Sequence, residues 1–214
     1  MTRDRWSALA PLTGVLFVAI AIVGFAIGGS TPDSDDTPQK VLSFYRDHDT
    51  KEIWASAFGA WSMVVFVFFL SVLRSALRAA EGGVSRLSTA AFGGGLLLAS
   101  GFLTFAGLNF TLADTADHLT PDAAQALNEL NTDMFFPLAA GNGVLMLATG
   151  LSILRYGGLP GLAGWAALAI GIAGVTPAGF FAFIAFGLWS LVVSVILWRR
   201  AEAAPPAPAT AARP

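Results

Sequence analysis

Long runs of residues without a charge constrain this sequence more than any other feature. The first run, Ser7–Gly29, holds 23 residues and no Asp, Glu, Lys or Arg. A helix of that length can cross the hydrocarbon core of a bilayer, which is about 30 Å thick. The run is too long for the apolar core of a secretory signal peptide, which has roughly 7–15 residues. We therefore interpret it as a retained transmembrane span.

Further apolar runs predict an all-α, polytopic membrane helix bundle. The last run, Leu159–Trp198, is apolar for 40 residues, and one helix of that length would be about 60 Å long, twice the hydrocarbon core. Thr176-Pro177-Ala178-Gly179 interrupts this run and favours two spans, of which the first is short, so a re-entrant hairpin stays open as the alternative. The sequence then predicts six transmembrane helices, at residues 7–29, 53–73, 87–112, 134–154, 159–175 and 180–198.

The composition agrees with a membrane protein and narrows the chemistry. Only 12% of the residues are charged and the mean hydropathy is +0.67, whereas soluble domains carry about 25% charged residues. The chain has no Cys, which excludes disulfides, thiolate catalysis and Cys-ligated metals. We expect one membrane domain over residues 1–200 and a disordered, Ala/Pro-rich cytoplasmic tail over residues 201–214.

Two polar segments predict short amphipathic helices in the outer loops. Thr37-Pro38 is typical of an N-cap followed by proline at the first helical position, and Thr120-Pro121 repeats the pattern. The apolar residues after each cap follow one helix face. They are Val41, Leu42, Phe44 and Tyr45 in the first helix, which ends near His48, and Ala123, Ala124, Leu127 and Leu130 in the second. We expect these helices to cap the outward end of the bundle.

The distribution of Lys and Arg predicts the orientation of the chain. With the amino terminus in the cytoplasm, nine of the twelve Lys and Arg residues fall in short inside segments. The other three, Lys40, Arg46 and Lys51, fall outside. Because an excess of Lys and Arg marks the cytoplasmic loops of membrane proteins, we expect both termini to be cytoplasmic, in the cytoplasmic membrane of a bacterium.

Small residues indicate where helices cross closely, since they let two backbones approach each other. Gly24 and Gly28 form a GxxxG pair in the first span. Ridges of small residues at intervals of four share one helix face in the third and fifth spans. The residues that we expect at helix–helix contacts are Gly24, Gly28, Gly95, Ala163 and Gly171.

Few polar side chains fall inside the apolar runs, and Asn142 is the one strongly polar side chain near the centre of any of them. We expect Asn142 to hydrogen-bond across helices to Ser100, Thr104 or Ser62, a contact that contributes about 1 kcal/mol. Orienting a buried polar ligand is the alternative. Asn109 lies nearer the outer surface and is a candidate for lining an outward-facing vestibule.

Ionisable residues inside a membrane usually mark proton relays and ion pathways. The six predicted spans contain none away from their ends, and we expect Glu52 and Asp133, at span boundaries, to be hydrated caps. His48 and His118 fall in the outer loops without the spacing of a zinc site. We therefore expect neither a metal site nor a cofactor.

Two short segments carry a family resemblance. Val41-Leu42-Ser43-Phe44-Tyr45-Arg46 lies in the first outer loop, and the second span ends in Leu73-Arg74-Ser75-Ala76-Leu77-Arg78. With four more spans, the layout resembles actinobacterial six-helix integral membrane proteins of unknown function, over most of residues 5–200. The resemblance implies the six-span fold and no activity, because none is assigned to those families.

The sparse chemistry favours a non-enzymatic membrane module that binds a lipid or a partner membrane protein. The alternative is a facilitator for a small neutral or hydrophobic solute, with Asn142, Asn109 and Thr104 along its path. An enzyme that acts on lipids through His118 and Asp114 or Asp117 is a third hypothesis. We expect no nucleic acid as a partner, and a homo-oligomer stays open.

Overall fold

The computed structural model describes residues 8–83, 86–176 and 179–203, and every regular element in these ranges is a helix. In chain order the elements are η1 (Ala10–Leu12), α2 (Thr13–Gly28), α3 (Pro38–Asp47), α4 (Asp49–Ala80), α5 (Arg86–Asp114), η2 (Ala116–His118), α6 (Pro121–Asp133), α7 (Phe135–Tyr156), α8 (Gly161–Gly174) and α9 (Gly179–Ala203). The predicted all-α fold is confirmed for this part of the chain. Residues 201–203, which we expected in a disordered tail, belong to α9, and residues 204–214 lie outside the described ranges.

Five helical segments are long and apolar enough to cross a bilayer. They are Ala10–Gly28, Asp49–Ala80, Arg86–Asp114, Pro121–Tyr156 and Gly179–Ala203. The crossing predicted over residues 159–175 corresponds to α8, which has 14 residues and is therefore about 21 Å long at 1.5 Å per residue. In place of six full-length spans, the described residues form five, plus one shorter apolar helix.

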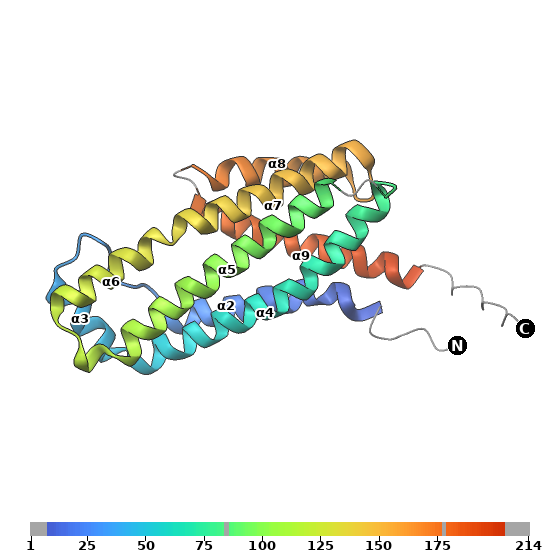
Figure 1. Ribbon diagram of the computed structural model, residues 1–214. Helices are drawn as coiled ribbons and strands as arrows, with labels where there is room; N and C mark the ends of the chain where they lie inside the picture. Colours follow the sequence, from blue (N-terminus) through green and yellow to red (C-terminus); the bar gives the residue numbers. More distant parts are fainter. Residues whose placement is uncertain (1–7, 84–85, 177–178, 204–214) are drawn as a thin grey trace, which may run out of the picture.

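The helices form an elongated bundle whose members pack in a closed ring. Each helix packs on the next, in the order α2, α4, α5, α7, α8 and α9, and α9 packs on α2 to complete the ring. Three aromatic rings join α2, α4 and α9, with centroids 5.1 Å apart for Phe17 and Phe66, 5.9 Å for Phe66 and Phe186, and 6.2 Å for Phe17 and Phe186. Figure 1 shows that α2 begins and α9 ends at the same end of the bundle.

The other end of the bundle carries α3 and α6, and we call it the capped end (Figure 1). The Thr37 hydroxyl accepts a hydrogen bond from the Lys40 amide, and the Thr120 hydroxyl accepts one from the Ala123 amide. Both predicted N-caps are therefore confirmed. The helix α3 packs against the bundle, since its residues Val41 and Tyr45 are buried.

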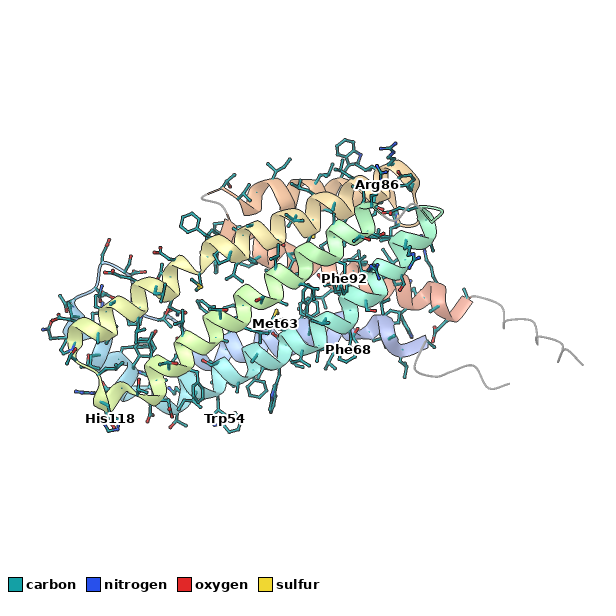
Figure 2. All side chains as sticks on the ribbon, viewed as in Figure 1. Trp54, Met63, Phe68, Arg86, Phe92 and His118 are labelled. Carbon is teal, nitrogen blue, oxygen red and sulfur yellow. The ribbon has the colours of Figure 1, made fainter. Side chains whose placement is uncertain are left out.

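Arginines collect at the opposite end, which we call the basic end. Arg78, Arg155 and Arg200 lie in the last turns of α4, α7 and α9. Figure 2 shows Arg86 at this end, and Trp54 and His118 at the capped end.

The helix α6 is a continuation of α7 rather than the separate short helix expected in the outer loop. Only Met134 separates the two, and together they form one segment of 36 residues. Pro137 explains the interruption, because proline has no N–H to donate to the carbonyl four residues earlier, at Asp133, and its ring crowds that carbonyl. The Met134 amide still bonds back to the Leu130 carbonyl at 3.2 Å, so the chain keeps its direction.

At the basic end, the buried Glu81 side chain ties three helices together. It follows the last residue of α4 and accepts hydrogen bonds from the amide and hydroxyl of Ser88 on α5, at 2.7 and 3.0 Å. The hydroxyl of Ser152 on α7 donates to it at 2.7 Å. A carboxylate that caps the start of a helix in this way satisfies amides that have no partner within the helix.

The α5 and α7 helices bring backbone against backbone at glycines. A Cβ atom added to Gly94 would lie 2.4 Å from the backbone nitrogen of Leu145, and one added to Gly141 would lie 2.4 Å from that of Leu98. No side chain fits at such a distance, because the atoms it would meet are backbone atoms. The α7 helix also approaches α8 closely, since a Cβ on Gly150 would lie 2.8 Å from the Gly164 carbonyl oxygen.

We predict that Gly94→Ala lowers the thermal stability of the protein in detergent, by about 1–3 kcal/mol, because its methyl group would push α5 away from α7. Gly93→Ala is the matched control, since a Cβ there meets nothing within 4 Å. The control should leave stability unchanged or raise it by up to about 1 kcal/mol, as expected for Gly to Ala inside a helix. Equal melting temperatures for the two variants would contradict the close contact.

Candidate functional site

The buried face of α4 extends to the capped end of the bundle and carries a carboxylate there. Its buried residues recur at intervals of three or four, as expected for one face of a helix. They are Glu52, Ser56, Gly59, Ser62, Met63, Phe66, Phe69, Leu70, Leu73 and Leu77. Glu52 therefore points into the bundle because it is in register with the apolar core residues of the same helix.

The prediction that Glu52 is a hydrated boundary residue is wrong. Only 1% of its surface is exposed. The reason is that α4 begins at Asp49, earlier than the predicted span, and the elements of the capped end cover its first turns. Asp133, in contrast, is exposed at the end of α6.

The Glu52 carboxylate is held by one protein donor. The Asn109 side-chain amide on α5 donates to Oε2 of Glu52 at 2.8 Å and lies 3.1 Å from the Ser56 hydroxyl. No donor among the described residues reaches Oε1 of Glu52. A buried polar atom without a partner is costly, and natural structures contain few of them.

Two further side chains enclose this group from the capped end. The Tyr45 hydroxyl on α3 lies 3.3 Å from the side-chain oxygen of Asn109 and 3.3 Å from that of Asn128 on α6, so its one hydrogen serves both acceptors. Burial raises the pKa of the Tyr45 phenol well above its usual range, and the nearby Glu52 carboxylate adds to the rise. Tyr45 therefore stays protonated and acts as a donor, which fixes the Asn109 amide with its nitrogen toward Glu52.

A groove opens beside this cluster and contains a cavity of about 120 Å³. About two turns each of α2, α4 and α5 line it, together with the start of the loop that follows α2. These residues are Ala21, Gly24, Phe25 and Gly28 of α2, Gly29 and Thr31 beyond it, Glu52, Ala55, Ser56 and Gly59 of α4, and Phe102, Phe105, Ala106 and Asn109 of α5. Phe25 is 63% exposed on the outside of the bundle. Glu52 and Asn109 make the groove polar near the capped end, and the phenylalanines make it apolar along the rest of its length.

Asn142 lies where the sequence analysis placed it, but without its expected partners. It is fully buried in α7, and neither its side-chain nitrogen nor its oxygen has a hydrogen-bond partner among the described residues. A Cβ added to Gly174 of α8 would lie 2.9 Å from the Asn142 nitrogen, so the amide packs against that glycine. Ser62, one expected partner, donates instead to the Gly59 carbonyl at 2.6 Å.

Ser100 and Thr104, the other expected partners of Asn142, are exposed on the outer face of α5. The Thr104 hydroxyl donates to the Ser100 carbonyl of its own helix at 3.0 Å. Asn142, Asn109 and Thr104 therefore occupy three different surroundings: the bundle interior, the cluster around Glu52, and the outer face. The structure does not bring them together along one path.

The small residues singled out for packing all lie at helix–helix contacts, as distances from an added Cβ or from the backbone show. For Gly24 the nearest atom is Phe58 Cβ at 3.2 Å, for Gly28 it is Ala55 Cβ at 3.1 Å, for Gly95 it is the Leu70 side chain at 2.5 Å, and for Gly171 it is the Leu147 side chain at 2.9 Å. The Ala163 carbonyl accepts a hydrogen bond from the Trp189 indole at 2.9 Å.

The two histidines lie apart from the groove lining and form no metal cluster. The His48 ring stacks on Phe44 at 4.6 Å, and its Nδ1 lies 2.9 Å from the Phe44 carbonyl oxygen. His118 is exposed in η2. Among the residues that the structure describes, no group of three or more His, Asp or Glu side chains could hold a metal ion.

Sequence reasoning selected Asn109 but missed Glu52, Tyr45 and Asn128. For Glu52 a signal was present, since Glu52, Ser56 and Gly59 continue the spacing of the buried face toward the amino end of α4. For Asn128 the apolar pattern gave no signal, because its role depends on α6 standing next to α3.

No protein-family model, no curated protein and no solved structure matches the chain. The class of protein is therefore assigned from the fold alone. By helix length and hydropathy the chain is a multi-pass helical membrane protein.

We predict that Asn109→Ala destabilises the protein by about 2–3 kcal/mol, because it removes the donor to a buried carboxylate. Thr104→Ala, five residues away on the exposed face of the same helix, is the control and should change stability by less than about 0.5 kcal/mol. Thermal unfolding in detergent measures both. A loss of the same size in both variants would show that Asn109 does not hold Glu52.

Proposed function

We propose that the chain crosses a bacterial cytoplasmic membrane six times, with both termini in the cytoplasm and the capped end outside. Two observations support this topology. The helix α2 starts and α9 ends at the basic end (Figure 1), and a chain whose ends lie on the same side crosses an even number of times. With five long spans, α8 counts as the sixth crossing in this topology. The arginines of that end would then be cytoplasmic, in line with the usual excess of Lys and Arg in inside loops.

This topology predicts a pattern of labelling by a membrane-impermeant maleimide. The chain has no Cys, so each single-cysteine variant reports on one site. In right-side-out vesicles, Ser34→Cys before α3 and Val175→Cys after α8 should be labelled directly. Ala79→Cys, near the end of α4, should be labelled only after permeabilisation. Labelling of Val175→Cys only from the cytoplasmic side would favour the re-entrant hairpin instead.

We also propose that the protein is a non-enzymatic membrane module that holds an amphiphile, such as a lipid, in the groove between α2, α4 and α5. One observation carries this proposal: the apolar groove ends at Glu52, whose buried carboxylate oxygen has no donor among the described residues. An apolar chain fits the walls formed by Phe25, Phe102 and Phe105. A polar head fits the end formed by Glu52 and Asn109.

The physics of the bilayer decides which part of the ligand gives selectivity. Lipid tails are as apolar as the side chains of Leu or Phe, so a chain that moves from the bilayer into the groove gains little by that move. Affinity must come from close packing in the groove and from the polar end. The groove therefore distinguishes ligands mainly by their head groups.

The alternative of a solute facilitator has no comparable support. It requires polar side chains along one path, and Asn142, Asn109 and Thr104 lie in separate surroundings.

Filling the groove should abolish binding of the amphiphile. Ala21 lines the groove, whereas Ala26 on the same helix is exposed elsewhere. We predict that Ala21→Phe removes a copurifying or added amphiphile from the native mass spectrum of the protein, and that Ala26→Phe retains it. An amphiphile that stays bound to Ala21→Phe with unchanged occupancy would exclude the groove as its site.

A further inference from the structure

Glu52 is the only charged residue among those that line the groove. Its Oε2 accepts from Asn109, and its Oε1 is buried and has no donor among the described residues. Lys40 pairs with Asp36 at 2.6 Å and Arg46 with Asp117 at 3.7 Å, so neither of these cations pairs with Glu52. Among the described residues the carboxylate therefore has a hydrogen-bond partner but no ion pair with Lys or Arg, and His48 is the one base whose charge acts on it.

We infer that the groove selects an amphiphile whose head is a primary ammonium, which donates to Oε1 of Glu52. This inference depends on the proposed amphiphile-binding function and adds the chemical class of the ligand. A buried charge is normally paired with an opposite charge, and a charge-assisted hydrogen bond is roughly twice as strong as a neutral one. An ammonium group supplies both.

The geometry of the cluster favours a donor head over an acceptor head. The Asn109 amide is oriented by Tyr45 so that its nitrogen serves Glu52, and the Tyr45 hydrogen is used by two amide oxygens. These donors are therefore already engaged. A phosphate or carboxylate head would meet no Lys or Arg along the groove and would face the Glu52 carboxylate.

The part of the groove beside Glu52 suits a small head. A Cβ added to Gly28 would lie 3.5 Å from Oε1 and 3.6 Å from Oε2 of Glu52, so Gly28, which also lines the groove, packs beside the carboxylate without a side chain of its own. A cavity of about 120 Å³ is close to the size of the engineered apolar cavities, about 150 Å³, that bind a benzene molecule. It accommodates an ammonium and the first carbons of a chain, and the rest of the chain follows the apolar walls.

The depth of the carboxylate also agrees with such a head. Trp54, two residues from Glu52, is exposed at the capped end (Figure 2), and tryptophan is typical of the membrane–water interface. The groove extends from Glu52 to Gly59 on α4, which is about 10 Å toward the middle of the bundle at 1.5 Å per residue. A ligand placed there keeps its charge at the interface and its chain in the membrane.

The test compares two amphiphiles of equal chain length, dodecylamine and dodecanol, by native mass spectrometry of the protein in nanodiscs of phosphatidylcholine at pH 7. A primary alkylamine is protonated at that pH, like a Lys side chain with its pKa of about 10.4. We expect dodecylamine to bind the native chain at least tenfold more tightly than dodecanol. In Glu52→Gln, which keeps the shape of the side chain and removes its charge, the ratio should fall to near one.

The outcomes separate the two proposals. Equal affinity for amine and alcohol in the native chain, or a preference for the amine that survives in Glu52→Gln, would overturn the ammonium assignment and leave the amphiphile site intact. If Ala21→Phe changes the binding of neither ligand, the groove itself is wrong. The comparison of ligands on the native chain remains decisive even if Glu52→Gln fails to fold.

Discussion

The close approach of the α5 and α7 backbones is the contact on which the rest of this bundle depends. In a bilayer, apolar side chains do not drive helices together, so van der Waals contact and hydrogen bonds must hold them. Gly94 and Gly141 allow backbone to meet backbone, and Gly150 allows α7 to meet α8 on its other side. The helix α5 also packs on α4, where the Leu70 side chain lies against Gly95. The packing of α5 on α4 brings Asn109 next to Glu52. The polar cluster at the capped end is a consequence of glycines located deeper in the bundle.

Much of the fold was predictable because helices in a membrane have few alternatives. Long uncharged runs specify the spans, and Thr37-Pro38 and Thr120-Pro121 specify two helix starts, which the structure confirms. The length of α8 was not predictable from hydropathy, since apolar residues continue on both sides of it while the backbone turns. The union of α6 with α7 was missed for a different reason. A polar helix next to an apolar run looks like a separate helix in a loop. The local sequence does not show that the interruption near Pro137 leaves the direction of the chain unchanged.

The candidate site was predictable only in part. Asn109 stands out as a polar residue near the end of an apolar run, but its role depends on the carboxylate 57 positions earlier in the sequence. Glu52 was assigned to the solvent because charged residues at span ends are usually hydrated, yet its register on α4 places it on the buried face. Asn142 illustrates the reverse error. Its burial was predicted correctly, and its hydrogen bonds were not, because Ser62 bonds within its own helix and Ser100 and Thr104 lie on the outer face of α5.

The continuity of α6 and α7 has a mechanical meaning. From Ser152, which donates to Glu81 at the basic end, to Asn128, which contacts Tyr45 at the capped end, the chain is helical but for one residue, a distance of about 36 Å at 1.5 Å per residue. Such a rod transmits torsion. A small rotation of α7 about its axis would swing Asn128 relative to α3 and loosen the Tyr45 hydroxyl from the amide that orients Asn109. The two ends of the bundle are thus linked by one nearly continuous helical segment.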